Sequence, residues 1–363
     1  MLRLTREMKW AFGLLAALLL TVNSVFVFAT GGGEKPKGQE TFFAISVRAI
    51  DNEYHANWDK GAKLFTTFIG MQQNYSALLC QNNNQLQIDQ IKALIEKSNG
   101  RAVFVIDPQE GPVLRPIAEI CEKNKIYWVS HWDKPPDMHP WDYKYWVSHI
   151  SADGTVGGYE IAKKMFAAFP TPNKGKIVAL QGALVSQAAI DRFQGLQRAL
   201  KEFPGVQLLD QQTAEWDRTK AVQTVENWLV AYPSQIDGVW AANDSMALGA
   251  VEALRSAGLA GKVKVVGCDG DSEAVEAIIK GEMTADVTPD PMWQAGMGLS
   301  LAYHALTGTF DPTQLPKEKR EWYVKWTMLD STNAQKYLDG LKTSPVYDWN
   351  DLWGRWAGPL QYR

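Results

Sequence analysis

The chain reads Gly-Val-Trp-Ala-Ala-Asn-Asp-Ser-Met-Ala-Leu-Gly-Ala-Val-Glu-Ala-Leu over residues 238–254. Its apolar start, residues 238–242, predicts a buried strand, and a helix is expected to begin at Asp244-Ser245. The polar pair Asn243-Asp244 falls at the junction, where a short polar side chain can cap the helix. Strand–helix units of this kind predict an α/β fold built on a parallel sheet.

The same unit recurs in both directions along the chain. One series of apolar runs covers residues 42–49, 76–80, 102–106 and 126–130, and a second covers 176–180, 206–209, 238–242, 263–268 and 284–288. Continuous apolar runs are typical of parallel strands that helices cover on both faces. The two series predict two doubly wound parallel-sheet lobes, and residues 146–150 between them are expected to form a connection.

Composition excludes several classes of protein. The 363 residues carry 37 Lys+Arg against 40 Asp+Glu, a net charge of −3, which gives no electrostatic footprint for nucleic acid. This length exceeds what one hydrophobic core usually supports, so two domains are expected. The sequence contains neither a phosphate-binding loop nor a Gly-x-Ser-x-Gly nucleophile motif, so nothing in it demands catalysis.

The N-terminus predicts export. Arg3, Arg6 and Lys9 precede an uncharged apolar stretch that ends in Val-Phe-Ala at residues 27–29. A basic start, an apolar middle and a small-residue exit are typical of a secretory signal peptide. We therefore interpret residues 1–29 as a signal peptide and residues 30–40 as a linker. The apolar stretch is also long enough to span a bilayer, so an uncleaved anchor is the alternative.

The three cysteines are Cys80, Cys121 and Cys268, all in apolar segments. An odd number allows at most one disulfide, and buried free thiols are the preferred interpretation. No Cys or His spacing matches a zinc site. The sequence implies neither a metal nor a cofactor.

Polar and aromatic residues follow the predicted strands. In an open parallel sheet, ligands bind outside the carboxyl ends of the strands. The candidates there are Asn52, Tyr54 and His55 after the first strand, Trp132 and Asp133 after the fourth, and Asn243 and Asp269 in the second series. Amides and carboxylates can bind sugar hydroxyls, and an aromatic face can pack on the C–H side of a sugar.

Structural roles compete with these interpretations. Asp244 is expected to be a helix cap, which leaves Asn243 as the stronger ligand candidate. Asn82–Asn84 and Asp107 are favoured as turn residues. Core packing is the expected role of Trp128, Trp216, Trp228 and Trp240, whereas Trp132 is a candidate for stacking.

The residues together resemble a known family, the periplasmic sugar-binding proteins of ABC transporters, those for ribose in particular. The likeness spans residues 41–330. It rests on 238–254, on Val265-Val-Gly-Cys-Asp-Gly270, on Leu180-Gln-Gly182 with Asp191-Arg192-Phe-Gln-Gly195, on His149-Ile150 with Gly157-Gly158, on Asp51-Asn52 with Gly61-Ala62, and on Gln81-Asn82-Asn83.

The resemblance implies two lobes joined by three hinge crossings, with a monosaccharide enclosed between them (the type I periplasmic binding protein fold). By position, Asn52, Tyr54 and His55 match an asparagine and two stacking aromatics of the first lobe. Arg192, Asn243 and Asp269 match polar contacts to the sugar. His55 replaces a Phe, Trp132-Asp133 replaces an Asp-Arg pair, and Pro289 replaces a Gln. These departures imply a polyhydroxylated ligand other than ribose.

We therefore expect a soluble, monomeric periplasmic protein that captures a sugar or polyol and delivers it to an inner-membrane ABC-transporter permease. The expected first lobe is 41–150 plus about 290–328, the second is 151–289, and 329–363 holds the third crossing and an irregular tail. A secreted carbohydrate-active enzyme is the alternative from another class. The effector domain of a transcriptional repressor is disfavoured, because a leader occupies the N-terminus in place of a DNA-binding module.

Overall fold

The structure is a computed structural model that describes residues 40–343 and 345–361. The predicted signal peptide, and the predicted linker up to residue 39, lie outside the described residues. No helix in the described part of the chain is long and apolar enough to cross a membrane.

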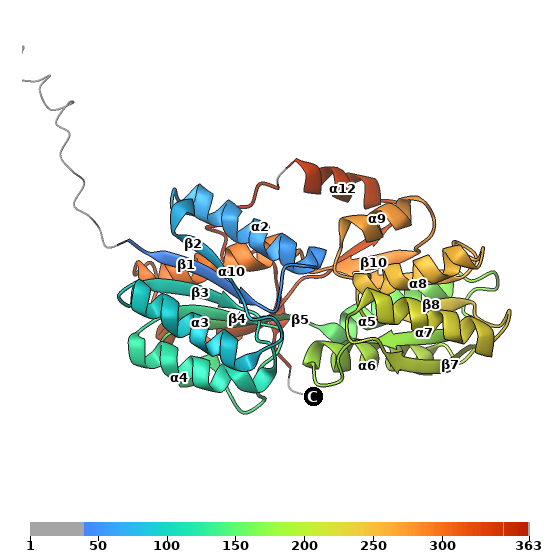
Figure 1. The fold of residues 1–363 in the computed structure, drawn as a ribbon, viewed down its shortest axis with the longest axis horizontal. Helices are drawn as coiled ribbons and strands as arrows, with labels where there is room; N and C mark the ends of the chain where they lie inside the picture. The colour runs from blue at the N-terminus through green and yellow to red at the C-terminus, as the bar shows by residue number, and fades with distance from the viewer. Residues whose placement is uncertain (1–39, 344, 362–363) are drawn as a thin grey trace, which may run out of the picture. The chain divides into compact units, whose positions relative to one another are not determined.

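The first lobe is built on a seven-stranded sheet (Figure 1). All its neighbouring strands are parallel except the last pair, in which β13 runs antiparallel to β11. In sheet order the strands are β13 (Trp356–Pro359), β11 (Glu321–Val324), β5 (Trp146–Ala152), β4 (Tyr127–His131), β3 (Ala102–Ile106), β1 (Phe42–Val47) and β2 (Tyr75–Leu79).

Helices cover both faces of this sheet. In β1, Phe43 and Ile45 pack against α2 (Glu53–Phe68) and α10 (Pro291–Leu306), and Ala44 faces α3 (Asn84–Lys97) and α4 (Leu114–Asn124). This alternation is the period-two pattern expected of a strand buried on both sides. The short helices of this lobe are η1 (Gln72–Asn74), η2 (Gly111–Val113), η3 (Pro140–Asp142), η4 (Pro312–Gln314) and α11 (Lys317–Arg320).

The second lobe is built on a six-stranded sheet that is also parallel except at one edge, where β12 runs antiparallel to β10. Its strands in sheet order are β12 (Thr327–Asp330), β10 (Ala285–Thr288), β9 (Lys264–Cys268), β8 (Gly238–Ala241), β6 (Gly175–Gln181) and β7 (Val206–Thr213). Its helices are α5 (Gly154–Ala167), α6 (Gln187–Glu202), α7 (Arg218–Ala231), α8 (Asp244–Ser256), α9 (Ser272–Ile279) and α12 (Ala334–Lys342).

The chain passes between the lobes four times: at three hinge crossings, from β5 to α5, from β10 to α10 and from β11 to β12, and once more between α12 and β13. Residues 146–150, expected to be a connection, are part of β5, an interior strand of the first sheet. All seven residues of β5 are buried, and the chain leaves this strand directly for α5 of the second lobe.

The C-terminal segment departs from the irregular tail that the sequence suggested. After α12, which packs on α9, the chain returns to the first lobe. There Trp349 is 3% exposed within the core of that lobe, and residues 356–359 form β13. The tail therefore belongs to the fold of the first lobe.

All three cysteines are buried and free, as expected. Among the described residues, no group of three or more His, Cys, Asp and Glu side chains is placed to hold a metal ion.

Candidate functional site

A cavity of about 230 Å³ receives side chains from both lobes. All eight residues selected from the sequence line it: Asn52, Tyr54, His55, Trp132, Asp133, Arg192, Asn243 and Asp269. The structure thus brings them together at the carboxyl ends of the strands, although their roles toward a ligand remain predictions.

The two asparagines among the selected residues, Asn52 and Asn243, are helix N-caps. The Oδ1 atom of Asn52 accepts a hydrogen bond from the His55 N–H at the start of α2, and Asn243 Oδ1 accepts from the Met246 N–H at the start of α8. The expectation that Asp244 caps this helix is therefore wrong. Asp244 is the first helical residue, and its carboxylate accepts hydrogen bonds from the N–H groups of Gly270 and Asp271.

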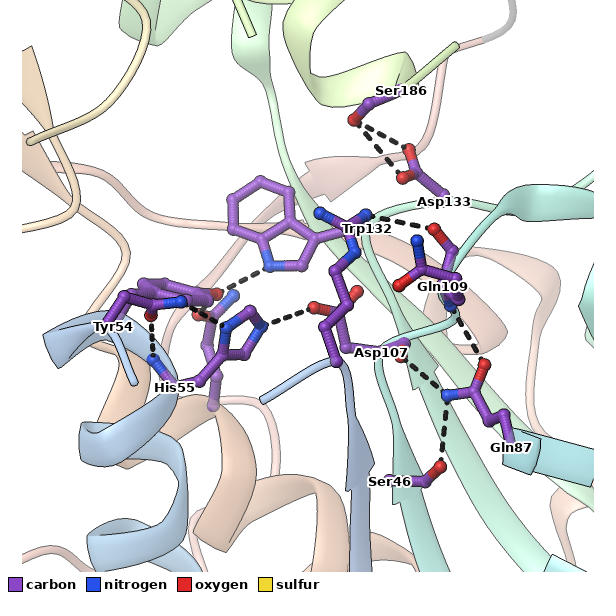
Figure 2. A network of polar contacts seen from close by, with 12 residues as sticks. Ser46, Tyr54, His55, Gln87, Asp107, Gln109, Trp132, Asp133 and Ser186 are labelled. Atoms are coloured by element: carbon purple, nitrogen blue, oxygen red, sulfur yellow. Dashed lines mark hydrogen bonds and ion pairs between the residues drawn. The ribbon is translucent and has the colours of Figure 1, made fainter. Parts of the chain in front are cut away.

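His55 is fixed by partners on both ring nitrogens. Because the oxygen of Asn52 serves as the helix cap, its amide N–H₂ faces His55 Nδ1 at 3.2 Å. Nδ1 is then the acceptor, and Nε2 carries the proton that it donates to Asp107 Oδ2 at 2.8 Å (Figure 2). Asp107, interpreted from sequence as a turn residue, thus belongs to the cavity wall.

Tyr54 and Trp132 form an aromatic wall in the first lobe. Trp132 Nε1 donates to the Tyr54 hydroxyl at 2.6 Å (Figure 2), and that hydroxyl in turn donates to Gln294 Oε1 at 2.8 Å. Gln294 is completely buried, so the polar atoms of this wall are directed into the lobe. The two residues therefore present mainly ring carbon to the cavity.

Arg192 enters the cavity from α6 of the second lobe and is 4% exposed. Its position depends on close packing of α6 on α5, since a Cβ at Gly158 would lie 2.0 Å from Arg192 O. Its Nη1 donates to the Ala242 carbonyl at 2.7 Å and lies 3.7 Å from Asp269 Oδ1. The guanidinium faces the rings of Trp132 and Trp216 at 5.1 and 5.7 Å. These contacts hold a charged group in a site otherwise shielded from water.

Asp269 lies in a group of buried carboxyl groups, with Asp244, Asp271 and Asp286. Burial raises the pKa of Asp269 to about 8, although Arg192 acts to lower it. Burial also raises the pKa values of the other three. A carboxyl group that is neutral near pH 7 can donate a hydrogen bond as well as accept one.

Asp133 joins the lobes across the cavity. Its Oδ2 accepts from Ser186 Oγ at 3.2 Å (Figure 2), and its Oδ1 accepts from the Gln187 N–H at 2.8 Å. Burial, followed by the charge of Asp107, raises the pKa of Asp133 to about 6. Its position at the end of β4 therefore serves contact between lobes as well as the cavity wall.

Several wall residues were missed from the sequence. Trp216, expected in the core, lines the cavity from the segment that follows β7, whereas Trp228 and Trp240 are in the core as expected. The strand-end rule applied to β7 would have selected Trp216. Asn82 and Asp107, favoured from sequence as turn residues, also line the cavity, and the remaining wall residues are Arg48, Ala49, Asp51, Ser186, Ala188, Glu215, Asp217 and Ser245.

Comparison with known proteins places this site in context. Residues 43–309 match the family described as Periplasmic binding protein domain. A xylitol-binding protein of Mycolicibacterium smegmatis is 34% identical over 72% of each chain, and a ribose import binding protein of Salmonella typhimurium is 29% identical over 73% of this chain and 84% of that one.

A solved structure titled as a twin-arginine translocation pathway signal protein, from Burkholderia phytofirmans, is also similar. It is 42% identical to this chain, has a TM-score of 0.86, and covers 90% of this chain and 100% of its own. The two mostly parallel sheets flanked by helices are those of the type I periplasmic binding protein fold. The chain belongs to the periplasmic binding protein family, whose members are non-catalytic binding proteins.

Proposed function

We propose that the protein binds a sugar or a related polyol in the cavity between its lobes and delivers it to an ABC-transporter permease. The observation that carries this proposal is the composition of the cavity wall. An arginine, carboxyl groups and amides share the wall with Tyr54, Trp132 and Trp216. Such a wall suits a ligand that is hydroxylated on its edges and apolar on its ring faces.

The size of the cavity favours a small ligand. Its volume of about 230 Å³ is below the range of roughly 300–1,000 Å³ typical of sites for drug-sized molecules. A monosaccharide or a polyol of similar size is therefore favoured over a disaccharide. The relatives named for xylitol and ribose support the same class of ligand.

The proposed mechanism is a hinge equilibrium. A ligand that contacts Tyr54 in the first lobe and Arg192 in the second stabilises the closed arrangement by its differential affinity for that state. The permease then distinguishes the closed, loaded protein from the open one. The proposal includes export to the periplasm, a monomeric state, and no bond-breaking step.

A thermal-shift screen tests the ligand class. We expect at least one member of a panel of pentoses, hexoses and polyols, including D-ribose, D-allose and xylitol, to raise the melting temperature, because a ligand that binds only the native state stabilises it. Amino acids and short peptides serve as the comparison panel. Stabilisation by a member of the comparison panel alone would contradict the proposal.

A matched pair of variants on α6 tests the site. Arg192→Lys keeps the charge but removes the planar guanidinium, and we expect it to weaken binding of the screened ligand at least about tenfold. Arg198→Lys is the control, because Arg198 is exposed and packs on Tyr159 rather than lining the cavity. Equal affinities of the two variants in titration calorimetry would place the ligand elsewhere.

A further inference from the structure

Two carboxylates of the first lobe contact the N-terminal ends of helices in the second lobe. Asp133 accepts hydrogen bonds from Ser186 Oγ and from the Gln187 N–H at the start of α6. Glu53, the first residue of α2, accepts a hydrogen bond at 2.8 Å from Ser272 Oγ at the start of α9. Ser186 and Ser272 are separated by most of the second lobe in sequence, so these are two independent contacts.

The two contacted helices differ from α5, α7 and α8 of the second lobe in how they begin, and α12 is a third helix there without a side-chain cap. The N-cap side chains of α5, α7 and α8 each accept a hydrogen bond from their own helix. In the described chain, the N-cap residues of α6 and α9, Ser186 and Asp271, make no such side-chain bond. The free N–H groups and the positive dipole end of a helix are stabilised by a nearby carboxylate. Here the carboxylate comes from the opposite lobe.

The same helices carry or adjoin the predicted ligand residues. α6 carries Arg192, and α9 begins three residues after Asp269. On the first lobe, Asp133 follows Trp132 and Glu53 lies between Asn52 and Tyr54 in the sequence. Each contact therefore joins a ligand-bearing segment of one lobe to a ligand-bearing segment of the other.

We propose that Asp133 and Glu53 are positioning residues that hold the lobes together, Asp133 through the Gln187 N–H and the Ser186 hydroxyl at the start of α6, and Glu53 through the Ser272 hydroxyl at the start of α9. This inference rests on the proposed function, because it treats lobe closure as the step that encloses the ligand. Opening the lobes removes both carboxylates and exposes both helix ends to water. The contacts thus contribute to the closed state independently of the chemistry of the ligand.

The Glu53–Ser272 contact provides the cleaner test, because neither residue lines the cavity. Both are partly exposed, so Glu53→Ala and Ser272→Ala are expected to fold. Loss of a contact that favours closure lowers the fraction of binding-competent protein, and the apparent dissociation constant rises by the same factor for every ligand. Glu96→Ala, which removes an exposed carboxylate from α3, is the matched control.

The experiment is a double-mutant cycle in titration calorimetry with D-ribose, D-allose and xylitol as probes. We expect each single variant to weaken binding about three- to tenfold, by the same factor for every probe that binds. The double variant should bind the probes no more weakly than the single variant with the lower affinity does. The control should bind as the wild type does. Additive effects, or factors that differ between probes, would overturn the proposal.

A ligand-free measurement separates this inference from the proposed function. If no probe binds the wild type, the sugar proposal fails, but the cross-lobe contacts can still be measured by small-angle X-ray scattering. We then expect the combined Asp133→Asn, Ser272→Ala variant to have a larger radius of gyration than the wild type. Equal radii would overturn the inference, and circular dichroism and melting temperature would confirm that the variant is folded.

Discussion

Replacing Asp269 by Asn should have opposite effects on stability and on ligand binding. The residue is 6% exposed, and the pKa of its side chain is raised to about 8 by burial. The same group in an unfolded chain titrates near 3.9. Between these two values the folded protein holds a proton that the unfolded chain has released, so stability is lost progressively as the pH rises through this window.

The magnitude follows from proton linkage. One bound proton changes the unfolding free energy by up to about 1.4 kcal/mol per pH unit, and because the folded group is about half ionised at pH 8, the change between pH 6 and pH 8 is about 2 kcal/mol. Asn has nearly the shape of the protonated acid and does not titrate. The variant should therefore lack this contribution to the slope and be more stable than the wild type at pH 8.

Urea denaturation of the ligand-free protein at pH 6, 7 and 8 measures this slope. Asp330→Asn is the control, because Lys164 holds the pKa of Asp330 at about 2, so it does not titrate in this window. The control should keep the wild-type pH dependence. Ligand affinity of Asp269→Asn should fall at least about tenfold, because one partner of a buried hydroxyl is altered. A variant that keeps the wild-type slope, or is less stable at pH 8, would refute the reasoning.

The remaining predictions concern the aromatic wall, the tail, the leader and the ligand charge. Trp132→Phe should remove most of the ligand-induced fluorescence change and weaken binding by about 0.5–1.5 kcal/mol, whereas an unchanged response would assign the signal to another tryptophan. Trp349→Ala should lower the unfolding free energy by about 3–5 kcal/mol in chemical denaturation, and a loss below 1 kcal/mol would exclude the tail from the cooperative fold. Mass spectrometry of protein from the native host should find a chain that begins at Thr30, and an intact N-terminus in a membrane fraction would indicate an anchor. D-galacturonate should stabilise the protein less than D-galactose in the thermal-shift assay, because its carboxylate would be repelled by the carboxyl group of Asp269 in the cavity wall. The reverse order would contradict this reasoning.

The alternation of strands and helices could be predicted from sequence because doubly buried parallel strands leave continuous apolar runs. The strand-end rule then selected seven of the eight candidate residues, and Arg192 followed only from the family resemblance. Trp216 was missed because an apolar residue beside a cavity and one in a core give the same local pattern. The strand-end rule applied to β7 would have pointed to the cavity, where the Trp216 ring lies beside Arg192.

The cap of α8 and the C-terminal tail also differ from what the sequence predicted, because local sequence does not determine either of them. Asn243 and Asp244 are adjacent residues that can each cap a helix, and the choice depends on which has extended backbone angles, as Asn243 does. The tail was difficult to predict because β13 is a four-residue edge strand and Trp349 packs on residues far away in sequence. Its ring fits over Gly296 of α10, where a Cβ would lie 2.3 Å from the indole.

The charges around the cavity bear on the ligand class. In the second lobe, Asp244, Asp269, Asp271 and Asp286 are buried together with raised pKa values, and Arg192 is the cation that faces Asp269. The Asp244 and Asp286 carboxyl groups share a side-chain hydrogen bond, whereas Asp271 Oδ1 accepts none from any described residue. Of the four carboxyl groups, Asp269 is the one that lines the cavity and can contact a ligand. A neutral ligand with several hydroxyl groups brings donors to this side of the cavity, whereas a carboxylated or phosphorylated one brings further repulsion. The electrostatics therefore favour neutral sugars and polyols over sugar acids, independently of the aromatic wall and of the family to which the chain belongs.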